Sequence, residues 1–157
     1  MQNKKHNFQA RLHAAMLKFD LGILMLGLFP CFWSIEKFVS IKKRGHLWRR
    51  AGVWIVKTAL RLNEIHLHVK HPQNARFCAI YAANHPSHFD GFLLLSLFGP
   101  NTILFTAPLG QFPKILGLWL KKMESVDVRR DPIDDKRYPT ARSKEQAIAK
   151  AAKHLEA

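Results

Sequence analysis

Residues 77–98 read FCAIYAANHPSHFDGFLLLSLF, and this stretch decides the fold that the sequence predicts. Its first part, residues 77–83, is a short continuous apolar run, which is typical of a strand buried on both faces of a parallel sheet. Its last part, residues 90–98, is an apolar run that we interpret as a helix. A polar loop that contains Pro86 separates the two. A strand, a loop and a helix in this order form the repeating unit of an α/β protein.

Downstream, apolar runs continue this alternation. We expect a strand at 102–106, a helix at 112–123, a strand at 125–129 and a final helix at 140–155. The final helix opens with Ser143 and Gln146, spaced as in a capping box, and we expect Ile148, Ala152 and Leu155 to pack on the sheet. The predicted fold class is α/β, a mostly parallel sheet flanked by helices and incomplete at the C-terminal end of the chain.

Upstream, two further elements precede the deciding stretch. We expect a helix at 47–62 with five apolar residues on one face and a half-exposed strand at 65–69, where apolar and polar residues alternate. The face of that helix consists of Trp48, Ala51, Ile55, Ala59 and Leu62. All four tryptophans, at 33, 48, 54 and 119, stand among apolar neighbours, which predicts core or interface positions.

The N-terminal region is the most apolar part of the chain. Residues 8–19 predict an amphipathic helix, and residues 21–35 (LGILMLGLFPCFWSI) carry no charge. Fifteen helical residues reach about 22 Å, less than the roughly 30 Å of a hydrocarbon core, and Pro30 predicts a kink. A longer span would place Lys18 and Asp20 in lipid. We favour a monotopic or shallow hairpin anchor over a buried core helix or a true span.

The charge balance is strongly basic. Lys and Arg number 25 against 11 Asp and Glu, which gives a net charge of +14 and a pI near 10.3. Such a charge favours an anionic partner: nucleic acid, a phospholipid surface or a phosphorylated substrate. No helix-turn-helix, zinc or aromatic-sheet motif is visible, so we expect no nucleic acid. The larger basic cluster follows the apolar run, as KKRGHLWRR at 42–50, and this favours a cytoplasmic body.

Two regions are therefore expected. Residues 1–45 form membrane-anchoring helices with a basic flank, and residues 46–157 form the α/β domain. The two cysteines, Cys31 and Cys78, stand inside apolar runs, where a small buried hydrophobe and a reducing compartment are the simplest interpretation.

The loop after residues 77–83 holds the candidate reactive groups, because ligands of parallel sheets bind at the carboxyl ends of strands. His85 at the strand exit has the chemistry of a general base, and the carboxylate of Asp90 is able to orient its ring. Two other interpretations stay open. In the first, His85 and Asp90 form a pair with a purely structural role. In the second, His85, His88 and Asp90 hold a metal ion. The histidines His66, His68 and His71 are expected to face solvent.

The segment YAANHPSHFDGF resembles the catalytic box of the glycerolipid acyltransferases, the superfamily of 1-acylglycerol-3-phosphate acyltransferases. The family signature, Asn-His followed by four residues and Asp, is matched by Asn84, His85 and Asp90. Downstream, residues 105–131 are similar to the stretch between the first and second boxes of the family. The resemblance covers residues 50–157.

The resemblance implies a reaction and a division of roles. His85 would deprotonate the acceptor hydroxyl for attack on an acyl thioester, with Asp90 holding the imidazole. Arg130, or its neighbour Arg129, would bind the phosphate of the acceptor, and Asn84 would also contact substrate. The donor would be acyl-CoA or acyl carrier protein and the acceptor a lysophospholipid, with no cofactor and no metal. The protein would lie on the cytoplasmic face of the inner or plasma membrane.

Two departures from the family pattern stand out. The later Glu-Gly-Thr-Arg box does not occur in the chain, and the second box, SVDVRR, is less apolar than expected. The sequence thus resembles the front portion of an acyltransferase. The alternative is a non-catalytic membrane-binding remnant of the same fold, in which Arg129, Arg130 and Arg137 form only a charged surface loop.

Overall fold

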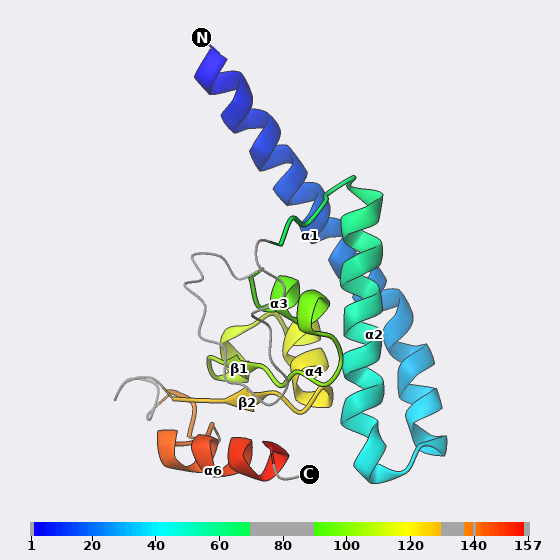
Figure 1. Cartoon of the computed structure of the whole chain (residues 1–157), viewed down its shortest axis with the longest axis vertical. Helices are drawn as coiled ribbons and strands as arrows, with labels where there is room; N and C mark the ends of the chain where they lie inside the picture. The colour runs from blue at the N-terminus through cyan, green and yellow to red at the C-terminus, as the bar shows by residue number, and fades with distance from the viewer. Residues whose placement is uncertain (1, 70–89, 130–136, 140, 156–157) are drawn as a thin grey trace.

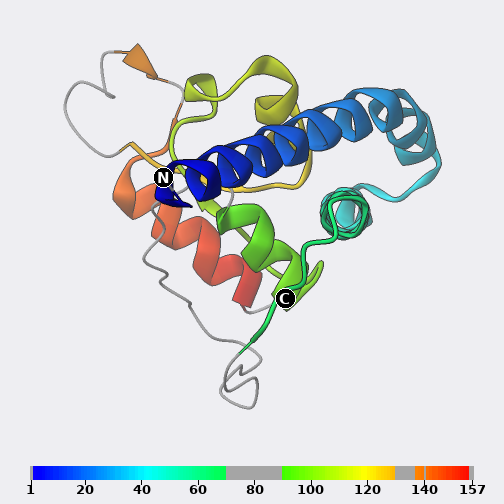
Figure 2. The ribbon, with the colours of Figure 1, turned by 90° about the horizontal axis from the view of Figure 1, so that it is seen from above.

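The structure is a computed structural model that describes residues 2–69, 90–129, 137–139 and 141–155. Two long helices lie side by side, α3 and α4 pack against them, and α6 packs on β2 (Figures 1 and 2). In chain order the elements are α1 (Gln2–Ile35), η1 (Glu36–Phe38), α2 (Ile41–Leu62), α3 (Asp90–Phe98), β1 (Phe105–Thr106), η3 (Leu109–Gln111), α4 (Lys114–Lys122), β2 (Val126–Asp127) and α6 (Lys144–Leu155).

The sheet is small and parallel. β1 pairs with β2, with Phe105 opposite Val126 and Thr106 opposite Asp127. A parallel bridge between Val128 and Arg142 brings the segment before α6 to the other edge of β2. Parallel neighbours need a crossover, and α4 supplies it between β1 and β2. The predicted α/β character is confirmed at this scale, although the described residues are mostly helical.

The prediction of a strand at 65–69 is wrong, because these residues form neither helix nor strand. Leu67 and Val69 are exposed, as are His66 and His68 between them. Alternation indicates a strand only where a neighbouring surface buries the apolar side chains, and no described element covers these two. The other strand expected on this side, residues 77–83, lies outside the described residues.

Four helices are found where the sequence predicts them. α3 has the predicted bounds, and α4 lies within the predicted range. α2 begins at Ile41, six residues before the predicted start, so the basic cluster at 42–50 is helical. At α6 the capping box is present: the Gln146 backbone N–H donates to Ser143 Oγ at 3.3 Å, and the Ser143 N–H donates to Gln146 Oε1 at 3.2 Å.

Two of the predicted helix faces need correction. Leu62 is exposed, although the other four residues of its predicted face are buried, because it stands in the last turn of α2, beyond the surrounding elements. Ile148 and Ala152 are also exposed, whereas Ala147 is buried. Successive residues of a helix are rotated by about 100°. Because the small Ala147 lies on the packed side of α6, the next residue, Ile148, points away from the sheet.

The core is centred on an aromatic cluster in which α1, α2 and α4 meet. Trp48 and Trp119 are completely buried, with ring centroids 4.8 Å apart and planes at 84°. Phe29 and Phe32 of α1 contact both tryptophans, at 5.2–6.2 Å between centroids. The contacts of Trp119 with Trp48, Phe29 and Phe32 are edge-to-face, an arrangement that the ring quadrupoles favour. The predicted core position is thus confirmed for Trp48 and Trp119, whereas Trp33 and Trp54 are half exposed.

α1 is one continuous helix through Pro30, so the two predicted N-terminal segments join without a break. Its inner side is buried through Leu21 and Met25, and the Trp119 indole donates to the Met25 carbonyl at 3.1 Å. Asp20 accepts a hydrogen bond of 2.7 Å from the Asn63 amide at the end of α2. One segment of the described chain, Leu12–Phe38, is long and apolar enough to cross a membrane, by length and composition alone.

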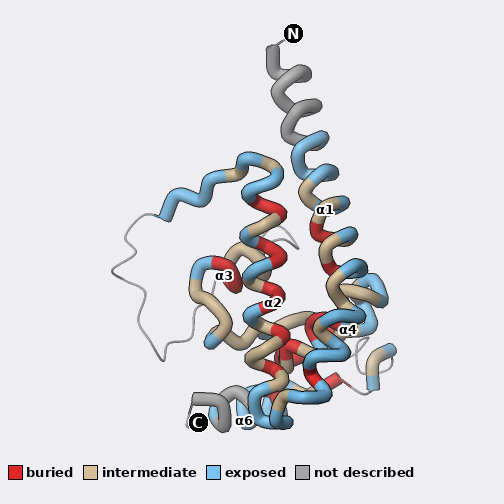
Figure 3. The backbone as a smooth tube through the Cα atoms, turned by 90° about the vertical axis from the view of Figure 1, so that its right-hand side faces the viewer, coloured by how far each residue is buried: buried red, intermediate tan, exposed pale blue. Residues whose placement is uncertain are grey.

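The outer side of α1 carries large apolar side chains that nothing in the described chain covers. They recur at intervals of three, four or seven residues and are about half exposed or more, with Phe19 at 68%. This apolar stripe consists of Leu12, Met16, Phe19, Ile23, Leu26 and Trp33. Cys31 is exposed, contrary to the prediction, because it also lies off the packed side. The side coloured as exposed in Figure 3 runs along α1 beside the buried side. A helix with apolar residues on both sides has two surfaces to cover, and the described residues cover the inner one.

Candidate functional site

The carboxyl ends of β1 and β2 form the edge at which a parallel sheet places its ligands. Thr106 ends β1 and Asp127 ends β2, directly opposite each other. Asp127 is buried and makes an ion pair with the Arg142 guanidinium. The Thr106 hydroxyl is also buried and, within the residues described, has no hydrogen-bond partner. Within the described residues, the edge therefore holds an acid that is paired and a buried hydroxyl that is not hydrogen-bonded.

Arg129 follows the strand at the same edge. Its backbone N–H donates to the Arg142 carbonyl at 3.0 Å, which extends the parallel ladder beyond β2. Arg129 is only partly exposed, whereas Arg137 is exposed. The charged-loop interpretation therefore describes Arg137 better than Arg129. Arg130 lies outside the described residues, so the choice between Arg129 and Arg130 as a phosphate ligand stays a prediction.

Asp90 is the first residue of α3 and is partly buried. A carboxylate at a helix N-terminus is stabilised by the unpaired backbone N–H groups and by the helix dipole. The predicted position of Asp90, at the start of the helix after the motif, is confirmed. Asn84 and His85 lie outside the described residues, and the pairing of His85 with Asp90 stays a prediction.

Arg142 is a residue of this edge that the sequence analysis does not identify. It stands one residue before the capping box, and no spacing relates it to Asp127, fifteen positions earlier. The parallel bridge between Val128 and Arg142 is what brings the two side chains together. Because strand register decides this contact, the sequence pattern carries no signal for it.

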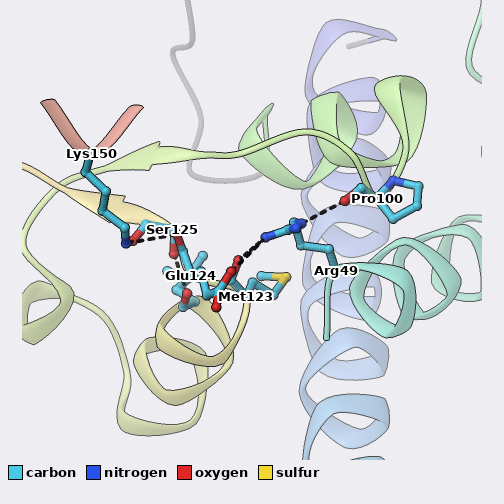
Figure 4. A network of polar contacts seen from close by, with 7 residues as sticks. Arg49, Pro100, Met123, Glu124, Ser125 and Lys150 are labelled. Carbon is cyan, nitrogen blue, oxygen red and sulfur yellow. Dashed lines mark hydrogen bonds and ion pairs between the residues drawn. The ribbon is translucent and has the colours of Figure 1, made fainter. Parts of the chain in front are cut away.

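A second polar network joins α2 to the segments that precede β1 and β2 and is drawn in Figure 4. Arg49 donates from Nε to the Pro100 carbonyl at 2.7 Å and from Nη1 to the Met123 carbonyl at 3.1 Å, and it lies 3.4 Å from Glu124 Oε2. Burial lowers the pKa of Arg49, and the charge of Glu124 partly offsets this effect. Arg49 thus fixes the turn between α4 and β2.

That turn is strained at one residue. Glu124 has a φ of 59°, in the left-handed region that residues other than glycine rarely adopt. Lys150 of α6 donates to the carbonyls of Glu124 and Ser125, at 3.2 and 3.5 Å. Burial also lowers the pKa of Lys150. The two basic residues hold the turn from opposite sides, which is a structural role for both (Figure 4).

A third polar group is buried where α1 turns into α2. Glu36 accepts a hydrogen bond of 2.5 Å from the Trp48 indole and an ion pair from Lys122. Burial by itself would raise the pKa of Glu36, but the hydrogen bonds from Lys122 and Trp48, with the charge of Lys122, lower it below its ordinary value. This carboxylate joins α2 and α4 to the end of the apolar helix.

Metal ligands do not gather in the part of the chain that the structure describes: no three His, Cys, Asp or Glu side chains form a candidate site there. His71, His85 and His88 lie outside that part, so the metal interpretation of the motif is not tested. Comparison with models of protein families, with curated proteins and with solved structures gives no match to the chain.

Proposed function

We propose that the protein is a membrane-associated O-acyltransferase that moves an acyl chain from acyl-CoA or acyl carrier protein to the hydroxyl of a lysophospholipid such as 1-acylglycerol-3-phosphate. The observation that carries the proposal is the position of the motif Asn84-His85-x4-Asp90, which ends on the first residue of α3. A carboxylate held at a helix terminus is well placed to orient a histidine in the preceding loop.

The chemistry assigned to these residues is a single acyl transfer. His85 accepts the proton of the acceptor hydroxyl as its oxygen attacks the thioester carbonyl. The tetrahedral intermediate collapses, the carbon–sulfur bond breaks, and the thiol leaves with the proton from His85. Asp90 keeps the imidazole in the required tautomer. Arg129 or Arg130 binds the acceptor phosphate, for which the planar guanidinium is suited.

The outer side of α1 supports the membrane part of the proposal. Its apolar stripe extends from Leu12 to Trp33, about 32 Å at the rise of an α-helix. The inner side of the same helix packs on Trp48 and Trp119, so a span would strip α1 from the protein core. We therefore propose that α1 lies in the membrane interface without crossing it, at the cytoplasmic face of the inner or plasma membrane.

The test is thiol release from acyl-CoA in detergent micelles that contain 1-acylglycerol-3-phosphate. Replacement of His85 by Ala should lower turnover by at least about 100-fold, the size of a general-base contribution. The matched control is His88→Ala, which removes a histidine three positions along the same motif and should leave turnover unchanged. Turnover of the His85→Ala variant at the wild-type rate would exclude the mechanism.

A second candidate function is membrane binding without catalysis. It is favoured by the same apolar stripe, which is suited to a membrane surface and implies no reaction. Under this alternative the unaltered chain binds vesicles and releases no thiol above the rate without protein. The His85→Ala variant then behaves like the unaltered chain in both assays.

A further inference from the structure

The outward side of α2 carries a row of basic side chains around one tryptophan. Its members are exposed and recur at intervals of seven, four, three and four residues, so they lie on one side of the helix. We name this row the α2 cationic face, and it consists of Lys43, Arg50, Trp54, Lys57 and Arg61. Along α2 in Figure 3, exposed stretches alternate with buried ones, as expected of a helix with two distinct sides.

Within the described residues, none of the cations of this face makes an ion pair inside the protein. In the residues that the structure covers, the ion pairs of Glu36, Glu124 and Asp127 are made with other basic residues. Within the same helix, Arg44 and Arg49 turn inward and donate to backbone carbonyls, Arg44 to Val39 at 3.1 Å. The helix thus separates arginines with a structural role from four solvent-facing cations that make no ion pair with a described carboxylate.

Repulsion among the cations of this row lowers the stability of the folded chain unless an anionic surface neutralises their charge. Like charges three or four residues apart on a helix repel one another, and Lys57 and Arg61 stand four apart. Trp54, 53% exposed, lies between cations and leaves much of a large ring in water. A row of cations interrupted by a tryptophan is suited to the boundary between water and lipid headgroups, where tryptophan is enriched.

The neighbouring elements identify the anionic partner as lipid. The turn that connects α1 and α2 exposes Phe38 at 91% and Ile41 at 76%, and α1 adds its apolar stripe. Nucleic acid offers phosphates to a basic helix but no hydrophobic phase for such side chains. A bilayer offers both, phosphates at its surface and acyl chains beneath.

We propose that the α2 cationic face binds the phosphates of anionic phospholipid headgroups, while the apolar stripe of α1 contacts the acyl chains. The choice of lipid as partner rests on the membrane association proposed above, but not on catalysis. The face extends from Lys43 to Arg61, about 27 Å at the rise of an α-helix, which is long enough to contact several headgroups. The consequence is selectivity for anionic lipid that belongs to this helix and not to the net charge of the protein.

The first test measures binding of the full chain to vesicles of phosphatidylcholine with and without phosphatidylglycerol. The quadruple variant Lys43→Gln, Arg50→Gln, Lys57→Gln, Arg61→Gln should bind the anionic vesicles at least about 100-fold more weakly, since each cation at an anionic surface contributes about fivefold. The matched control removes the same charge from exposed positions elsewhere, with Lys114→Gln, Lys121→Gln, Arg137→Gln and Lys144→Gln.

The second test keeps all the cations and measures how deeply Trp54 and Trp33 enter the bilayer. In a Trp33→Phe variant, Trp54 is the one exposed tryptophan in the described chain, because Trp48 and Trp119 are buried. A nitroxide at the headgroup should quench its fluorescence more strongly than one deep in the acyl chain. In the reciprocal Trp54→Phe variant, Trp33 should show the opposite order.

The outcomes separate this inference from the proposed function. Equal losses in the two quadruple variants, or quenching of Trp54 by neither nitroxide, would overturn the inference and leave the acyltransferase proposal standing. Binding of a double-stranded oligonucleotide as tight as that of anionic vesicles, lost in the same quadruple variant, would overturn the choice of lipid. Failure of the unaltered chain to bind either vesicle would overturn the inference together with membrane association.

Discussion

The two long helices α1 and α2 differ in the side chains on their outer surfaces. α1 presents apolar side chains both to the core and to the outside, whereas α2 buries small and apolar residues and presents cations. Both contribute to the same aromatic cluster, α1 through Phe29 and Phe32 and α2 through Trp48. The inner sides thus specify the fold of the hairpin, and the difference between the helices lies in what each requires from its surroundings.

The largest effect should come from the cluster that both helices share. Replacement of Trp119 by Ala removes a completely buried ring that contacts α1 and α2, and should lower the free energy of unfolding by about 3–5 kcal/mol. The control is Trp54→Ala on the outside of α2, for which we expect less than about 1 kcal/mol. Urea unfolding of both variants makes the measurement, and similar losses would show that the two tryptophans are not divided between core and surface.

A smaller loss is expected where the helices turn into each other. Replacement of Glu36 by Gln leaves the Lys122 ammonium without its ion pair and should cost about 2 kcal/mol at pH 7. Because the folded-state pKa of Glu36 is lowered, this stabilisation is complete above its ordinary pKa of 4.5 and is lost as the pH falls through the lower, folded value.

The difference in stability between the unaltered chain and Glu36→Gln should therefore shrink below about pH 4.5, in urea unfolding at several pH values. Glu64→Gln, an exposed carboxylate beyond the end of α2, is the control and should show no such trend. If the stability difference between the unaltered chain and Glu36→Gln did not change with pH, the charge of Glu36 would not be the source of the stabilisation.

The outer side of α1 should affect membrane binding more than folding. Phe19→Ser on the apolar stripe should weaken vesicle binding about tenfold, which corresponds to about 1.4 kcal/mol and is the order expected for a large side chain removed from lipid. Its unfolding free energy should change by less than about 0.5 kcal/mol. Met25→Ser on the inner side is the matched control, with the opposite pattern of a large loss of stability.

Glycine substitutions give the smallest effect and the sharpest contrast. A Cβ at Gly22 of α1 meets nothing within 4 Å, so Gly22→Ala should stabilise the helix by about 0.5–1 kcal/mol. A Cβ at Gly52 of α2 lies 2.9 Å from Met123 Sδ and 3.2 Å from Leu95 Cδ2, so Gly52→Ala should destabilise the protein. Thermal melts of the two variants decide the matter, and a shift in the same direction for both would contradict the packing described for α1.

The sequence predicts the local features of this fold well. The start of α3 at Asp90 and the capping box at Ser143 are both found, because apolar periodicity and capping depend on residues close together in the chain. The same reasoning fails at Leu67 and Ile148, whose burial depends on what lies across from them. It also treats residues 42–50 as one basic cluster, whereas the fold divides them into inward and outward cations.

The candidate site is predictable to a lesser degree. Asp90 follows from the motif, but Arg142 reaches Asp127 only through the register of a parallel bridge, which no pattern in the sequence specifies. Glu36 is equally hidden, because its partners are 12 and 86 residues away. Contacts between distant parts of the chain are set by packing, and single-sequence patterns report mainly on neighbours.

The hydrogen bond from Trp119 to the carbonyl of Met25 joins residues 94 positions apart, and this separation matters during synthesis. At about 5–20 residues per second, a ribosome needs roughly 5–20 s to add the residues between Met25 and Trp119. During that interval α2 and its Trp48 can already pack on α1, but the part of the inner side that Trp119 covers stays open. If α1 associates with a membrane as proposed above, this order of synthesis lets its outer side contact the bilayer before α4 is complete.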